Sequence, residues 1–122
     1  MSFFLKVLTG ETGKNMVQSE FASVKAILAV VPDFVLNPIA WGTYQSTPHN
    51  HFFMAKFHKL KPDPPVPIDA FVTRLVTLHG KSKSLTGKFG FDMTTYAGNL
   101  SQMTGWEDSW GTFFSKSLQH AF

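Results

Sequence analysis

The chain starts with an apolar run over residues 3–8 that only Lys6 interrupts, and a glycine-bearing turn follows it, so this run is predicted to be a β-strand. Because side chains alternate in direction along a strand, the odd-numbered positions lie on one face and Phe4, Lys6 and Leu8 on the other. Lys6 is therefore the one charged residue in an otherwise apolar strand.

A helical period follows over residues 15–31, where Val17, Val24 and Ile27 fall on one stripe at three- and four-residue spacing. Residues 9–13 predict a turn before this helix, with Asn15 as its N-cap, and Pro32 ends it. Glu20 lies on the apolar stripe. Because a buried charge is costly unless it is paired, the pattern predicts an ion pair between Lys6 and Glu20.

The middle of the chain predicts two strands joined by the polar turn of residues 45–50, with an extended stretch over 34–44 and a strand over 51–57. Four prolines within residues 62–67 then exclude both a helix and a central strand, so residues 59–67 are interpreted as a connector. A helical pattern covers residues 68–79, with Gly80 as its expected C-cap.

Residues 81–107 show no helical period, yet they carry many apolar side chains that must lie against a surface. A last helix is predicted from Asp108 or Ser109, either of which can cap it, to Phe122.

Composition narrows the class of protein. The 122 residues, 43% hydrophobic and 16% charged, are typical of one globular domain and not of a disordered chain. The net charge of +3 comes without a basic stripe interleaved with aromatic residues, so nucleic acid is not an expected partner. The chain has no cysteine and no apolar run long enough to span a membrane, so we expect a cytoplasmic protein without a membrane partner. His49, His51 and His58 lack the further ligands that a zinc site needs.

Several segments, in this order and spacing, resemble the fructosamine kinases, also called ketosamine or ribulosamine kinases, and most closely their fungal members. The early segments are Phe4-Leu5-Lys6-Val7, Met16 to Ile27, Val31 to Val35, Pro38 to Gly42 and His51 to Phe53; the later ones are Leu75 to His79, Gly87 to Phe91, Thr95-Tyr96, Gln102, Gly105-Trp106, Asp108 to Trp110 and Phe113-Phe114. The likeness covers essentially the whole chain.

The resemblance implies an α+β chain with a partial protein-kinase-like fold. Residues 1–58 would form part of the small lobe, an antiparallel sheet with one helix. Residues 59–67 would be the linker, and residues 68–122 would begin the large lobe with the family's aromatic insert. The implied function is ATP-dependent phosphorylation of the 3-hydroxyl of a protein-bound ketosamine, which leads to deglycation. The implied partners are a nucleotide and a glycated protein.

The resemblance also implies roles for five residues. Lys6 matches the lysine that grips ATP phosphates, and Glu20 matches its ion-pair partner. Ala55, Lys56 and Phe57 match the hinge that touches adenine through its backbone, although the family usually has an acidic residue in place of Lys56.

The family's glycine-rich loop would precede Phe3, and its catalytic base and metal-binding residues would follow Phe122. ATP and Mg²⁺ are thus implied as cofactors, but we expect no catalytic residue and no metal ligand within these 122 residues. We therefore expect a kinase truncated at both ends and inactive alone. The alternative is a non-catalytic remnant or interaction module with a kinase-like small lobe.

Overall fold

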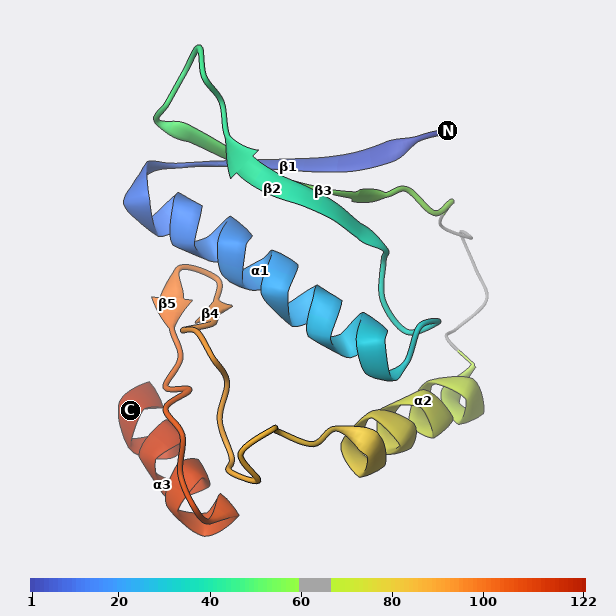
Figure 1. Cartoon of the computed structure of the whole chain (residues 1–122), viewed down its shortest axis with the longest axis vertical. Helices are drawn as coiled ribbons and strands as arrows, with labels where there is room; N and C mark the ends of the chain where they lie inside the picture. The colour runs from blue at the N-terminus through green and yellow to red at the C-terminus, as the bar shows by residue number, and fades with distance from the viewer. Residues whose placement is uncertain (60–66) are drawn as a thin grey trace. The chain divides into compact units, whose positions relative to one another are not determined.

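The computed structural model describes residues 1–59 and 67–122. Within them the elements are β1 (Phe3–Thr9), α1 (Gly10–Val30), β2 (Pro38–Thr43), β3 (Asn50–Lys56), α2 (Ile68–Lys81), β4 (Tyr96–Ala97), β5 (Leu100–Ser101) and α3 (Trp110–Ala121), labelled in Figure 1. Small antiparallel sheets combined with helices place the chain in the α+β class that the sequence predicts.

The chain divides into two compact units, Met1–Ser82 and Lys83–Phe122. The lobe boundary predicted at residues 59–67 stays a prediction, because residues 60–66 of that connector lie outside the described residues.

A three-stranded antiparallel sheet with the order β1-β3-β2 forms the centre of the first unit. The predicted hairpin is present as β2 and β3, and β3 also pairs with β1 along its whole length, from Phe3 opposite Lys56 to Thr9 opposite Asn50. Helix α1 runs along one face of this sheet (Figure 1).

The core of this unit lies between α1 and β3. Val17 of α1 is completely buried against Phe53 and Ala55 of β3, and Leu8, Phe21 and Trp41 surround them. Gly13 brings the helix close to β1, since a β-carbon at this position would lie 3.0 Å from both the carbonyl carbon and the β-carbon of Leu8.

The predicted start of the first helix is wrong. Helix α1 begins at Gly10, so residues 10–13 are helical and Asn15 is not the N-cap; Thr9 occupies that position without a side-chain capping bond. The reason is that Gly10 alone reverses the chain, with φ of 75°, while its N–H donates to the His49 carbonyl over 2.9 Å. The predicted end before Pro32 is confirmed, since the helix stops at Val30.

The predicted C-cap of the next helix is also wrong. Gly80 lies inside α2, and Ser82 is the C-cap, its N–H donating to the Leu78 carbonyl over 2.9 Å. Gly80 does not have the positive φ of a left-handed C-cap glycine, so the helix continues through it.

The second unit holds the long segment without helical period and α3. Backbone bonds join its distant parts: Phe89 pairs with Glu107, and the N–H of Phe91 donates to the Thr104 carbonyl over 2.9 Å. Strands β4 and β5 form a short hairpin that the sequence pattern did not predict, because each is only two residues long. Ser109 caps α3 as predicted, with its hydroxyl oxygen accepting the Thr112 N–H at 3.1 Å.

Candidate functional site

The predicted ion pair between strand and helix is present. The ammonium group of Lys6 on β1 donates to a carboxylate oxygen of Glu20 on α1 over 2.8 Å. Both side chains are partly exposed, at 38% and 33%, so each can still be reached by a ligand.

Helix packing directs Glu20 toward the sheet. Gly13, Val17 and Glu20 follow one another at four- and three-residue spacing, which places them on one side of a helix. Gly13 and Val17 are buried against the sheet, so Glu20, one turn further along, points to the same sheet face as Lys6. The close helix–strand contact at Gly13 thus positions the acidic partner for the lysine.

An open cavity of about 1120 Å³ adjoins this pair. Its polar lining includes Glu20, Asp33, Asn37, Lys56 and His58. Its apolar lining is formed by two sheet residues, by the second half of α1 and by the segment that joins α1 to β2, namely Phe4, Phe53, Val24, Leu28, Pro32, Phe34, Val35 and Leu36. The cavity therefore offers an apolar wall beside charged groups of both signs, a combination suited to a ligand with a flat apolar part and an ionic part.

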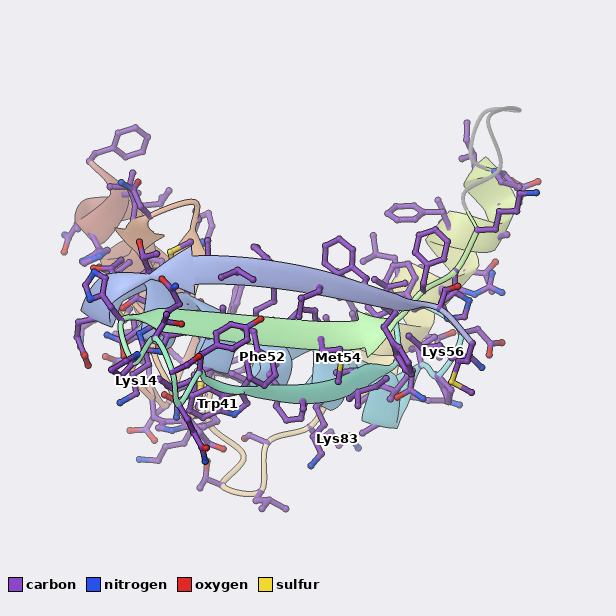
Figure 2. All side chains as sticks on the ribbon, turned by 90° about the horizontal axis from the view of Figure 1, so that it is seen from above. Lys14, Trp41, Phe52, Met54, Lys56 and Lys83 are labelled. Atoms are coloured by element: carbon purple, nitrogen blue, oxygen red, sulfur yellow. The ribbon has the colours of Figure 1, made fainter. Side chains whose placement is uncertain are left out.

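The three predicted hinge residues have different surroundings. Ala55 is completely buried in the core, whereas Lys56 at the end of β3 (Figure 2) is exposed and lines the cavity, and Phe57 is 45% exposed. The N–H of Lys56 donates to the Asn37 carbonyl over 2.9 Å, and that of Phe57 donates to the Ser2 carbonyl over 3.0 Å. These two main-chain donors are already engaged, so a ligand that needs one of them must displace its present acceptor.

Residues 32–37 form one wall of the cavity, and the sequence does not predict this contribution. Pro32 is predicted only to end the helix, and the side chains after it show no periodic pattern that would reveal a cavity wall. His58 also lines the cavity. His51 is buried, and its Nδ1 lies 2.8 Å from the hydroxyl of Thr43 on the neighbouring strand, so His51 has a structural role within the sheet.

The described ranges contain no group of three histidine or acidic side chains that could hold a metal ion. No metal-dependent step is assigned to the described residues. None of the helices in the same ranges is both long enough and apolar enough to cross a bilayer.

Comparison with known proteins decides the family. The sequence profile described as fructosamine kinase matches residues 1–119. The chain belongs to the fructosamine kinase family. No curated protein sequence matches it significantly.

A solved structure supports the kinase-like fold of this family member. The chain is similar to the crystal structure of a protein assigned as a fructosamine-3-kinase from Haemophilus somnus 129PT, with a TM-score of 0.72 and 20% sequence identity. The match covers 94% of this chain but only 37% of the bacterial protein. The fold accordingly matches part of the kinase-like fold of that structure, which confirms the predicted partial kinase-like fold.

Proposed function

We propose that this chain carries part of the nucleotide site of a ketosamine kinase, an enzyme that transfers a phosphoryl group from ATP to the 3-hydroxyl of a protein-bound ketosamine. The family to which the chain belongs supports this reaction class. The ion pair between Lys6 and Glu20 carries the assignment of the site, because a strand lysine held by a helix glutamate is the arrangement that grips ATP phosphates in protein kinases.

The cavity supports a place for the rest of the nucleotide. Phe4 and Phe53 offer an apolar surface next to Glu20, and Lys56 stands at the end of the same strand as Phe53. In this proposal Lys6 binds phosphate oxygens, Glu20 fixes the position of Lys6, and the backbone of residues 55–57 contacts the adenine. The N–H groups of Lys56 and Phe57 are engaged, so adenine binding there requires a local rearrangement or the use of carbonyl groups.

We also propose that the 122 residues do not turn over substrate alone. Phosphoryl transfer depends on positioning and on electrostatic stabilisation by metal ions, and the described residues offer no metal-binding cluster. The chain spans little more than a third of the bacterial relative, whose remaining length has no counterpart here.

Nucleotide binding is the direct test. A fluorescent ATP analogue titrated into the purified chain should bind, and Lys6→Ala should weaken binding at least about tenfold, which equals about 1.4 kcal/mol. Lys25→Ala is the control, because Lys25 is an exposed lysine of α1, the helix that carries Glu20, and its ammonium lies 5.8 Å from the Phe21 ring. Equal binding by the Lys6→Ala and unmodified proteins would contradict the assignment.

Catalysis is tested separately. The purified chain, supplied with ATP, Mg²⁺ and a fructosyl-lysine peptide, is expected to release no phosphorylated peptide detectable by mass spectrometry. Turnover that disappears in Lys6→Ala would show that the chain is a working enzyme and would refute the proposed inactivity.

A further inference from the structure

Strand β2 is irregular where it begins, beside the candidate hinge. Its register with β3 is regular from its C-terminal end as far as Ala40, which lies opposite Met54. Pro38 lies opposite Ala55, the next residue of β3, so Ile39 has no partner on that strand. One extra residue on one strand of an antiparallel pair is a β-bulge.

Proline explains why the bulge forms. Without it, Ile39 would lie opposite Ala55, and Pro38 would lie opposite Lys56. Lys56 directs its backbone groups to the β2 side, where its N–H donates to Asn37, so the residue opposite Lys56 occupies a hydrogen-bonded position. In a regular bonded pair each residue donates its N–H to the carbonyl of the other, and proline has no N–H to donate. Pro38 therefore disfavours the regular register.

The bulge changes which backbone groups are paired at the candidate hinge. Pro38 now lies at a non-bonded position, where its missing N–H costs the ladder nothing. Asn37 takes the bonded position, and its carbonyl accepts the Lys56 N–H over 2.9 Å. The Lys56 carbonyl points to the same side of β3, and within residues 1–59 and 67–122 no backbone N–H donates to it. The bulged register thus leaves an acceptor next to the cavity that Asn37 and Lys56 both line.

We propose that Pro38 is a positioning residue of the nucleotide site. By preventing the regular register, it keeps the Lys56 carbonyl out of the sheet ladder and available to the base of a nucleotide. This inference rests on the proposed nucleotide site. The N–H groups of Lys56 and Phe57 are engaged, so carbonyl groups are what the hinge offers to a base. A carbonyl acceptor suits adenine, whose exocyclic amino group is a donor.

The register itself can be tested without a ligand. Pro38→Val supplies the missing N–H with a residue that favours strands, so this variant should adopt the regular register, with position 38 bonded to Lys56. Hydrogen exchange read by NMR should then show the amide of position 38 protected at least about tenfold over that of Ile39, which would face away from β3. An unprotected amide at position 38 would overturn the proposal, because the bulge would then form without proline.

A pair of nucleotides tests the consequence for the site. ATP carries the exocyclic amino group of adenine, and purine riboside triphosphate lacks it. The unmodified chain should bind ATP about three- to tenfold more tightly, as expected for one hydrogen bond. Pro38→Val should bind the two nucleotides equally, because the new N–H occupies the carbonyl. Pro48→Val, the same exchange in the turn between β2 and β3 and outside the cavity lining, should keep the preference.

The outcomes separate this inference from the proposed function. A chain that binds neither nucleotide refutes the nucleotide site, and the inference with it. Binding of both without a preference for ATP, or with a preference that Pro38→Val retains, refutes only the role of Pro38. Lys6→Ala should weaken both nucleotides and keep their ratio, because it acts at the phosphate end.

Circular dichroism checks the fold of each variant. If Pro38→Val is unfolded, Pro38→Ala replaces it, since alanine supplies the same N–H with a smaller side chain. Unfolding of both variants would overturn the proposal, because the regular register adds a hydrogen bond and should be at least as stable as the bulged one.

Discussion

At the scale of single residues, Gly13 matters most for the candidate site. It allows α1 to approach Leu8 so closely that a β-carbon would lie 3.0 Å from two atoms of that residue, one of them in the backbone. The approach places the next turns of the helix, and with them Glu20, against the sheet. A glycine inside a helix costs about 1 kcal/mol relative to alanine, and here the close contact accounts for that cost.

We therefore expect Gly13→Ala to lower the free energy of unfolding by about 1–3 kcal/mol, because overpacking at a rigid strand outweighs the better helix propensity. Urea denaturation followed by circular dichroism measures the change. Gly80→Ala is the matched control, since Gly80 lies inside α2 with nothing within 4 Å, and this variant should be as stable as the parent or slightly more so. A stabilised Gly13→Ala protein would show that the helix can move away from Leu8 without cost.

At the scale of elements, the second unit depends on a capped helix. Ser109 accepts the Thr112 N–H at 3.1 Å and satisfies a donor at the first turn of α3 that would otherwise lack an intrahelical partner. Trp110 follows at once and stacks near Phe113 and Phe114, with ring centroids 5.6 and 5.8 Å away. The start of the helix therefore fixes the position of the aromatic cluster.

Ser109→Ala should destabilise α3 by about 1 kcal/mol through loss of this capping bond. Amide hydrogen exchange of residues 112–116, read by NMR, should accelerate several-fold. Ser115→Ala changes an exposed serine of the same helix that caps nothing, and its exchange should stay the same or become slower. Unchanged exchange in Ser109→Ala would mean that water or another group caps the helix equally well.

The sequence predicted elements well where one periodic pattern determines them. The strand at Phe3 and the helix end before Pro32 follow from local sequence patterns. The Lys6–Glu20 pair is present as predicted, but both side chains are partly exposed, so the spacing that directs them toward each other accounts for the pair better than the cost of burying a charge. The start of α1 was not predicted correctly, because a turn and a first helical turn use the same small and polar residue types. The hydrogen bond from the Gly10 N–H to the His49 carbonyl, which marks where the strand ends and the helix begins, cannot be read from local sequence.

Features that depend on contacts between residues far apart in the chain could not be predicted from the sequence. The central place of β3 arises from pairing with β1 across most of the first unit, and no local pattern encodes that order. The engagement of the Lys56 N–H by Asn37, which bears directly on the hinge, has the same origin. Residues of the cavity wall were missed because cavities form between elements, whereas periodicity describes one element at a time.

At the scale of the whole molecule, more large hydrophobic side chains are exposed than buried among the described residues. In the described ranges the buried hydrophobic residues are Val17, Val31, Phe53 and Ala55. Large hydrophobic residues remain exposed in both units, among them Ile68 and Val76 of α2 and Trp110 and Leu118 of α3. Exposed apolar surface of this kind binds hydrophobic dyes and promotes association.

We expect the folded chain to enhance the fluorescence of an anilinonaphthalene sulfonate dye without denaturant, and the signal to fall when urea unfolds the protein. A weak signal throughout, together with one sharp unfolding transition, would contradict this. Phe53→Ala removes a buried ring from the small core and should lower the free energy of unfolding by about 3–5 kcal/mol. The dye signal of this variant should therefore fall at a lower urea concentration than that of the unmodified chain.

The position of β3 has a consequence for how the chain acquires its structure during synthesis. The strand that pairs with both others is the last of the three in the sequence, so β1 and α1 leave the ribosome before β3 exists to pair with β1. Until residues 50–56 emerge, the lysine strand has α1 beside it but lacks its pairing with β3. A nascent chain arrested at Pro48 should therefore be digested readily by protease, and one extended well beyond Lys56 should resist it.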